Sequence, residues 1–366
     1  MYSVESLVRA LVNVSEKAAN LARLCRANED IFKLLVQEKT KDEANPRFVR
    51  DFKTLADVLI QEMVRHDIGK EFPELKENIR GEESSTFTNS LGETITVEVG
   101  DSLEETANLL EKVLYGNKLV ADLLAGEVHR DITTEDAAKI EGLDVEISSA
   151  DVGIWVDPID GTAEYIQGKA RDTAVPNIPA SGLRCVTVLL GVYEIESGRP
   201  IVGVINQPFA VEADDGKFSG KIFWGVAIDG VKRTNVPQAE AAGAAAGRKK
   251  VAILSSAENK KYIYYLRDTL GYSIIFSAGA GHKILKLIQG DADLYLVSTG
   301  STYKWDTCGP QAILRALGGG LINLQETIDT KTVVELSYAR NSGKCNIGGV
   351  LGFRTHTQLM EFSKLL

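Results

Sequence analysis

Residues 155–162 read Trp-Val-Asp-Pro-Ile-Asp-Gly-Thr and carry the clearest chemical potential of the chain. Two carboxylates, Asp157 and Asp160, follow an apolar run of β type, and a segment that can begin a helix comes next. Carboxylate oxygens suit hard cations such as Mg²⁺, and the backbone N–H groups of Gly161 and Thr162 suit a phosphate. The segment predicts a metal-assisted phosphate site, with an Asp-Pro turn capped by threonine as the plain alternative.

Further carboxylates elsewhere in the chain could join this site. Glu82 and Glu83 are adjacent after a short apolar strand, so a shared role requires an irregular strand end, which Gly81 permits. Asp306 lies where a helix begins and could equally be its N-cap. Asp57 lies off the apolar stripe of a predicted helix, where a solvated carboxylate is the default expectation. Local sequence alone leaves each of these roles open.

Composition bounds the class of protein. The chain has 366 residues, 44% of them hydrophobic, which is enough for two domains. A net charge of −10 argues against nucleic acid as a partner, and it requires cations at any site for an anionic substrate. Neither a membrane span nor a signal peptide is indicated. Scattered cysteines without a CxxC pair predict reduced thiols and a cytoplasmic protein, and the histidine spacing argues against a transition-metal site.

Hydrophobic periodicity predicts the elements that must position these residues. Helices are expected over the first 40 residues, from Phe52 to Val64, and over 103–127. Neighbouring strands then predict a mixed or antiparallel sheet, and strand and helix signals alternate in the last third of the chain, as in an α/β domain. The remaining predicted strands are 152–156, 185–193, 201–205, 221–228, 251–254, 272–276 and 294–297, and the remaining helices are 258–269, 281–289 and one from Trp305.

An Ala/Gly-rich stretch at 231–249 predicts a linker or exposed loop. We therefore expect an N-terminal α+β domain over residues 1–235 that holds most of the candidate metal ligands. A C-terminal α/β domain over residues 250–366 would carry Asp306 and substrate-binding elements.

A glycine-rich turn, residues 276–283, leads into one of the predicted helices. Gly279 and Gly281 permit close approach of the backbone to a ligand, and Lys283 supplies a positive charge for a second phosphate. A plain helix-entry turn with a solvated lysine is the alternative.

Taken in chain order, these motifs resemble the signature of the lithium-sensitive, Mg²⁺-dependent phosphatase superfamily that includes inositol monophosphatase. The resemblance spans nearly the whole chain and is greatest to the members that act on inositol polyphosphates. One departure is Gly309, where the superfamily usually has alanine, and we expect from it a slightly weaker helix start. The matching segments are 14–20, 51–57, 81–84, 157–162, 203–209 and 304–306.

The resemblance implies a layered αβαβα sandwich of the α/β class and two or three Mg²⁺ ions, with Li⁺ as an inhibitor. Asp57 and Thr162 would form the catalytic dyad that activates water. Carboxylates that converge without cations would repel one another, so the cluster itself implies metal. The implied metal ligands are Asp57, Glu82, Glu83, Asp157, the Ile159 carbonyl, Asp160 and Asp306. The implied substrate contacts are Asp160, Gly161, Thr162, Ser256, Lys260, Gly279, Gly281, Lys283 and Asp306.

The activity that the resemblance implies is removal of the 1-phosphate from inositol 1,4-bisphosphate and inositol 1,3,4-trisphosphate by a monomeric cytoplasmic enzyme. A 3′(2′),5′-bisphosphate nucleotidase would share every metal ligand, but the Ser-Ser-Ala-Glu segment at 255–258 departs from the Ser-Arg-Ser-His-like pattern of that group. A non-catalytic inositol-phosphate-binding protein is the alternative from another class. It predicts the loss of a carboxylate or of the threonine, and all of these residues are present.

Overall fold

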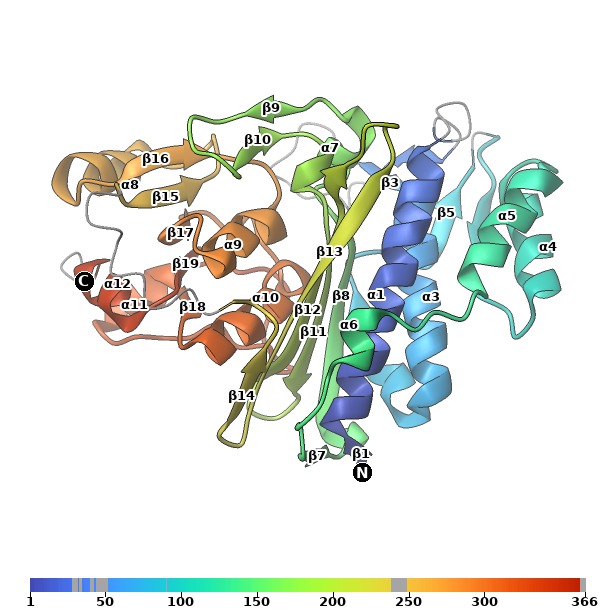
Figure 1. Ribbon diagram of the computed structural model, residues 1–366, viewed down its shortest axis with the longest axis horizontal. Coiled ribbons are helices and arrows are strands. Elements are labelled where there is room, and N and C mark those ends of the chain that lie inside the picture. The colour runs from blue at the N-terminus through green and yellow to red at the C-terminus, as the bar shows by residue number, and fades with distance from the viewer. Residues whose placement is uncertain are drawn as a thin grey trace.

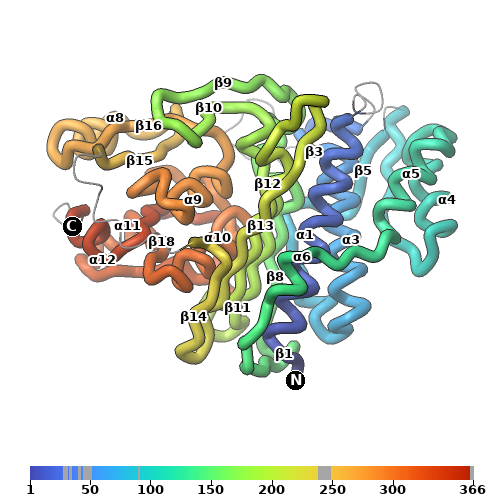
Figure 2. Tube along the Cα trace, in the orientation of Figure 1, coloured from blue at the N-terminus to red at the C-terminus, as the bar shows by residue number. Residues whose placement is uncertain are grey.

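Layers of helix and sheet alternate across the molecule (Figure 1). The structure is a computed structural model that describes residues 1–27, 32, 35–39, 43, 52–89, 91–237 and 249–362. Two large β-sheets are separated by one helical layer and flanked by two others, an arrangement that the Cα trace also shows (Figure 2). This is the αβαβα sandwich expected from the sequence.

The larger sheet has six strands in the order β14-β13-β12-β11-β8-β4. Adjacent strands in this sheet pair antiparallel, except that β4 runs parallel to β8. Its strands are β4 (Ile79–Gly81), β8 (Val152–Asp160), β11 (Thr187–Glu194), β12 (Pro200–Glu212), β13 (Phe218–Ile228) and β14 (Val231–Thr234).

The smaller sheet has five strands in the order β16-β15-β17-β19-β18, and β15 runs parallel to both of its neighbours. Its strands are β15 (Val251–Leu254), β16 (Ser273–Phe276), β17 (Leu294–Val297), β18 (Gly320–Asn323) and β19 (Val350–Phe353). Short pairs complete the strands: β1 (Tyr2–Ser3) with β7 (Glu146–Ile147), β2 (Val36–Glu38) with β3 (Phe52–Thr54), β5 (Thr86–Thr88) with β6 (Thr94–Thr96), and β9 (Arg171–Asp172) with β10 (Pro179–Ser181).

The helices divide among three layers. α1 and α3 cover one face of the six-stranded sheet, α9 and α10 fill the space between the sheets, and α8, α11 and α12 belong to the outer side of the five-stranded sheet. The helices are α1 (Val4–Arg26), α3 (Leu55–Glu71), α4 (Leu103–Val113), α5 (Lys118–Val128), α6 (Glu135–Ala138), α7 (Thr162–Gln167), α8 (Lys260–Tyr264), α9 (Ala280–Gln289), α10 (Lys304–Leu317), α11 (Leu324–Thr330) and α12 (His356–Phe362).

The helix expected from Phe52 to Val64 spans Leu55–Glu71, because Phe52–Thr54 forms β3. Two other helix expectations were also wrong in detail. The first helix ends at Arg26, and residues 36–38 form a strand instead of continuing it. The helical signal over 103–127 is two helices, because Tyr115 and Gly116 adopt positive φ angles of 58° and 78° that break the helical path.

The stretch expected to be a linker begins with regular structure. Val231–Thr234 forms β14 at the edge of the six-stranded sheet, and residues 238–248 lie outside the described part of the chain. The two sheets come from residues 79–234 and 251–353. They share one buried cluster, in which Trp155 and Leu189 of the larger sheet join Ile253 of the smaller one. The two-domain division stays a prediction.

The described cysteines are all free thiols, and three of them are buried. In the described ranges, no helix has the length and apolar character needed to cross a membrane.

Helix α10 lies directly against the backbone of the six-stranded sheet. A Cβ atom added to Gly203 would lie 1.9 Å from the Gly309 carbonyl oxygen, and one added to Gly309 would lie 2.4 Å from the Leu190 oxygen. Glycine at 309 is therefore explained by close packing, and alanine would force the helix away from the sheet. This contact fixes the start of α10, where Asp306 lies.

We predict that Gly203→Ala destabilises the protein by about 1–3 kcal/mol or more, because the added methyl group overpacks the contact between helix and sheet. The control is Gly126→Ala in α5, where an added Cβ meets no atom within 4 Å. This control should be neutral or should stabilise by up to about 1 kcal/mol. Urea unfolding midpoints measure both, and equal midpoints for the two variants would contradict the packing argument.

Candidate active site

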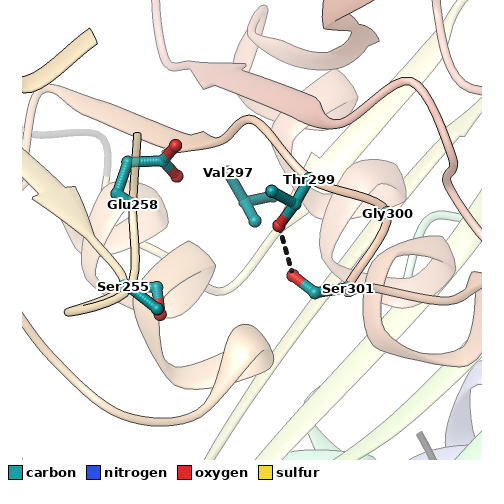
Figure 3. A pocket seen from close by; sticks show the side chains of 7 residues that line it. Ser255, Glu258, Val297, Thr299, Gly300 and Ser301 are labelled. Atoms are coloured by element: carbon teal, nitrogen blue, oxygen red, sulfur yellow. Dashed lines mark hydrogen bonds between the residues drawn. The ribbon is translucent and has the colours of Figure 1, made fainter. Parts of the chain in front are cut away.

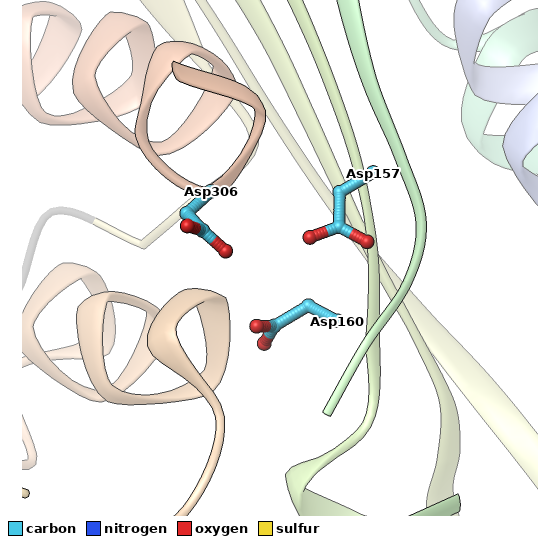
Figure 4. A group of neighbouring side chains, drawn as sticks. All are labelled: Asp157, Asp160 and Asp306. Carbon is cyan, nitrogen blue, oxygen red and sulfur yellow. The ribbon is translucent and has the colours of Figure 1, made fainter. Parts of the chain in front are cut away.

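Three buried aspartates converge between the two sheets (Figure 4). Asp157 and Asp160 come from the end of β8, and Asp306 comes from the first turn of α10. One carboxylate oxygen from each lies within 4.8 Å of the others. The side chains are 1%, 6% and 8% exposed, in that order, so water contributes little to their solvation. All three aspartates belong to the set of metal ligands that the sequence predicted.

A local irregularity in β8 brings Asp157 and Asp160 to the same side. On a regular strand, residues three positions apart point to opposite faces. Asp157 pairs with Leu189 and Asp160 with Thr187, so three steps on β8 match two steps on β11. This bulge turns the two carboxylates toward one another. The sequence-based strand ended at Val156, whereas β8 continues through Asp160.

The first turns of two helices fix the carboxylates of Asp57 and Asp306. Asp57 is the third residue of α3, and its Oδ2 accepts hydrogen bonds from Thr54 N at 2.7 Å and Thr54 Oγ1 at 2.6 Å. Asp306 occupies the same position in α10, and its Oδ2 accepts from Tyr303 N at 2.5 Å. The default expectation that Asp57 is solvated was wrong, since its side chain is fully buried. The N-cap of α10 is Tyr303, and Asp306 closes its capping box.

Glu82 and Glu83 follow β4, and the backbone of Glu83 is held by a side chain from α3. Gln61 accepts from Glu83 N at 2.9 Å and donates to the Glu83 carbonyl at 2.7 Å. A Cβ atom at Gly81 would lie 1.9 Å from Gln61 Oε1, so glycine makes room for this clamp. The expected irregular strand end is present, and it brings both glutamates to one lysine, Lys39.

Asp160 is bound by the N-terminus of α9. Its carboxylate accepts from the N–H groups of Ala280 at 3.1 Å, Gly281 at 3.0 Å and His282 at 3.4 Å, and from Thr187 Oγ1 at 3.0 Å. The glycine-rich turn predicted to hold a second phosphate thus uses these amides to position an aspartate. No sequence motif indicated this pairing across 120 residues.

The remaining predicted phosphate contacts lie close to the aspartates in the chain. Gly161 has a φ of 85° and precedes α7, and Thr162 Oγ1 donates to the Ile159 carbonyl at 3.1 Å. Lys283 Nζ donates to the Gly279 carbonyl at 2.8 Å. Within the described ranges, no hydrogen bond joins Asp57 to Thr162, so the catalytic dyad stays a prediction.

A pocket of about 340 Å³ opens at the carboxyl ends of β15 and β17 (Figure 3). The predicted contacts Ser256 and Lys260 are exposed in the adjoining segment and do not line it. Glu258 accepts from Ser298 N at 3.0 Å, so the wall carries a fixed carboxylate that suits hydroxyl groups better than phosphate. The lining residues are Ser255, Ala257, Glu258, Val297, Thr299, Gly300 and Ser301.

Burial and mutual repulsion govern the protonation of the acidic cluster. Burial, followed by the charges of neighbouring carboxylates, raises the pKa values of Asp157 and Asp306 well above the usual range. Burial likewise raises the pKa of Asp57 to about 7, and burial together with Glu82 raises that of Glu83 to about 8. The charged forms therefore need a cation.

The donor set fits a hard divalent cation. Asp57 Oδ1 and Asp157 Oδ1 are buried and have no hydrogen-bond partner among the residues that the structure describes. Buried carboxylate oxygens without donors are costly unless a cation coordinates them. An all-oxygen ligand set of this kind suits Mg²⁺.

Comparison with solved structures identifies the class of fold. An IMPase from Thermotoga maritima superposes with a TM-score of 0.52 at 14% identity, and the alignment covers 96% of this chain and 93% of that one. A profile of the inositol monophosphatase family matches residues 61–350. The chain therefore belongs to the inositol monophosphatase family, which confirms the resemblance seen in the sequence.

Within this family, the chain is more similar to one group of relatives. It is 40% identical to the inositol polyphosphate 1-phosphatase of Mus musculus, over 98% of this chain and 96% of that protein. It is 28% identical to the 3′(2′),5′-bisphosphate nucleotidase 1 of Rattus norvegicus, over 94% of this chain and 89% of that one.

The raised pKa values predict an unusual dependence of stability on pH. The folded protein keeps protons on these acids that the unfolded chain has lost, so the free energy of unfolding falls as pH rises from about 4 to the folded values. Those values are about 7 for Asp57 and about 8 for Glu83. Each group lowers stability by about 1.4 kcal/mol per pH unit within its window.

Urea unfolding in EDTA should therefore show lower stability at pH 8 than at pH 6, and Mg²⁺ should remove the difference. Asp157→Asn should flatten the pH dependence, whereas Asp151→Asn, at an exposed aspartate just before the same strand, should not. Equal slopes in both variants would show that the cluster does not control stability.

Proposed function

We propose that this protein is a Mg²⁺-dependent, lithium-inhibited phosphomonoesterase that removes the 1-phosphate from inositol 1,4-bisphosphate and inositol 1,3,4-trisphosphate. The observation that carries the proposal is the convergence of Asp157, Asp160 and Asp306 in a chain that aligns end to end with inositol polyphosphate 1-phosphatases. A function as a bisphosphate nucleotidase has weaker support, because the nucleotidase of Rattus norvegicus is only 28% identical to this chain.

The metal-binding residues in this proposal are those that the sequence implied. Asp157, Asp160 and Asp306 would hold Mg²⁺ on one side, and Glu82 and Glu83 on the other. Asp57 and the Ile159 carbonyl would complete the set. A divalent cation held by these residues would supply positive charge for the phosphoryl oxygens, for a bound water and for the leaving alkoxide.

The chain's own residues then supply orientation and proton transfer. Asp57 Oδ2 is held by Thr54, which leaves the buried Oδ1 free to accept a proton from the attacking water. Thr162 would orient that water once its hydroxyl turns from the Ile159 carbonyl. The N–H groups of Gly161 and Thr162 would bind the scissile phosphate.

The second phosphate of the substrate would lie near the turn that precedes α9. The amides of this turn are already bonded to Asp160, so the backbone there serves the metal site first. Lys283 would supply positive charge for a distal phosphate, with Gly279 and Gly281 allowing close approach. Ser256 and Lys260 are exposed and could contact the same end of the substrate.

We also propose that the enzyme acts as a cytoplasmic monomer with small molecules as its partners. The unpaired cysteines and the excess of acidic over basic residues support this proposal.

Phosphate release with Mg²⁺ tests the function directly. Inositol 1,4-bisphosphate should be hydrolysed much faster than inositol 1-phosphate or adenosine 3′,5′-bisphosphate, and Li⁺ should inhibit the reaction. Preference for the nucleotide would move the function to a nucleotidase on the same metal site. No release from any of the three substrates would support the non-catalytic alternative.

Asp57→Asn should lower kcat by about 10²–10⁴-fold, because an amide can preserve the helix cap but cannot accept the proton. The matched control is Asp67→Asn in the same helix, where the carboxylate pairs with Lys17 outside the cluster. Thermal unfolding of both variants would establish that they fold. An unchanged kcat in Asp57→Asn would remove this residue from the mechanism.

A further inference from the structure

The segment that leads into α10 has no regular structure of its own. β17 ends at Val297, and residues 298–302 form neither helix nor strand before α10 begins at Lys304. Asp306 depends on this segment, because its Oδ2 accepts a hydrogen bond from the N–H of Tyr303 at 2.5 Å. The direction of the Asp306 carboxylate is therefore set by the residues that hold Tyr303 in place.

The first turns of α10 are held only weakly by the helix itself. Gly309 costs about 1 kcal/mol of helix propensity relative to alanine. Pro310 has no N–H, so the carbonyl of Asp306, four residues earlier, receives no hydrogen bond from the helix. The start of α10 thus needs contacts from outside the helix to keep one geometry.

A segment near the C-terminus supplies such contacts. Tyr303 and Cys345 form an isolated antiparallel bridge. Beside it, Asn346 N donates to the Thr302 carbonyl at 2.8 Å. This backbone pairing places the side chain of Asn346 against the start of α10.

The Asn346 amide binds the residues that surround the helix cap. Its Nδ2 donates to the Tyr303 carbonyl at 3.1 Å. It also lies 3.2 Å from Thr302 Oγ1 and 3.3 Å from Thr307 Oγ1. Thr307 Oγ1 in turn donates to the Tyr303 carbonyl at 3.0 Å, and the two threonines are only 2% and 0% exposed. A carbonyl can only accept, so the amide nitrogen is the group that this position requires.

We propose that Asn346 is a positioning residue for Asp306. It fixes Tyr303, whose N–H holds one oxygen of the Asp306 carboxylate, and so keeps that carboxylate directed toward Asp157 and Asp160 (Figure 4). Asn346 is uncharged, so its effect on a bound cation is geometric. Loss of a residue that orients a metal ligand typically weakens metal binding by about 10–100-fold. This inference rests on the metal requirement of the proposed function.

Calorimetric titration of the metal-free protein with Mg²⁺, without substrate, tests the proposal. Asp306→Asn identifies the phase of binding that uses this carboxylate. Asn346→Leu, which keeps the size of the side chain and removes its hydrogen bonds, should weaken the same phase by about 10–100-fold. Asn341→Leu makes the same change at an exposed position of the same segment and should bind Mg²⁺ like the wild type. Unchanged affinity in Asn346→Leu would overturn the proposal.

A second variant tests the network without altering the C-terminal segment. Thr307→Val keeps the shape of the side chain and removes the hydroxyl that joins Asn346 to the Tyr303 carbonyl. It should weaken the same phase. The double variant with Asn346→Leu should lose less affinity than the product of the two single losses, because both changes act on one network. Fully multiplicative losses would show that the two residues act independently and would contradict the proposal.

Thermal unfolding distinguishes positioning from a purely structural role. If Asn346 only stabilised the fold, Asn346→Leu would lower Tm by the same amount in EDTA and in Mg²⁺. A positioning role predicts in addition a smaller rise of Tm on addition of Mg²⁺, since that rise depends on the affinity for the ion. Equal rises in the wild type and in Asn346→Leu would refute the positioning role.

These outcomes separate this inference from the proposed function. Mg²⁺ binding that is indifferent to Asn346 rejects the inference alone, whereas a wild-type protein that binds no Mg²⁺ rejects the proposed function together with it. Weakened binding in Asn346→Leu, in a protein that hydrolyses no phosphate ester, would retain the inference and reject the activity.

Discussion

Electrostatic repulsion among buried carboxylates is the constraint on which the rest of the structure depends. Asp57, Glu83, Asp157, Asp160 and Asp306 are all nearly excluded from water and lie in one region. Such a cluster can persist only if each charge is protonated, hydrogen bonded or paired with a cation. The fold provides all three. It also leaves two buried carboxylate oxygens, Asp57 Oδ1 and Asp157 Oδ1, without a hydrogen bond in the described residues, and a metal ion could coordinate them.

The N-termini of three helices supply many of the hydrogen bonds that stabilise these carboxylates. The first turn of α3 holds Asp57, that of α10 holds Asp306, and the amides of α9 hold Asp160. Unsatisfied N–H groups at a helix start carry partial positive charge, so each helix stabilises the anion that it positions. In Asp57 these contacts fix one oxygen and leave the other for a ligand, whereas both oxygens of Asp160 accept hydrogen bonds. Stability and ligand geometry therefore have a common origin.

The sequence predicted the layered fold and the acidic residues, because short motifs and periodic apolar residues are local signals. The close approach of Asp157 to Asp160 required a bulge that only the pairing of β8 with β11 reveals. Asp57 seemed solvated because its burial depends on packing that periodicity does not describe. Lys39 lies in the charged run Glu38-Lys39-Thr-Lys41, which is typical of a surface, so its burial against the glutamates could not be predicted.

The packing of α10 and the hydrogen bonds from α9 to Asp160 bring distant parts of the chain together at one point. Asp157 and Asp306 are 149 positions apart in the sequence (306 − 157), so their contact is among the long-range contacts of the fold. Long-range contacts form late and slowly in folding. A divalent ion that binds only when these residues have met would stabilise the completely folded chain and would leave partly folded molecules unstabilised.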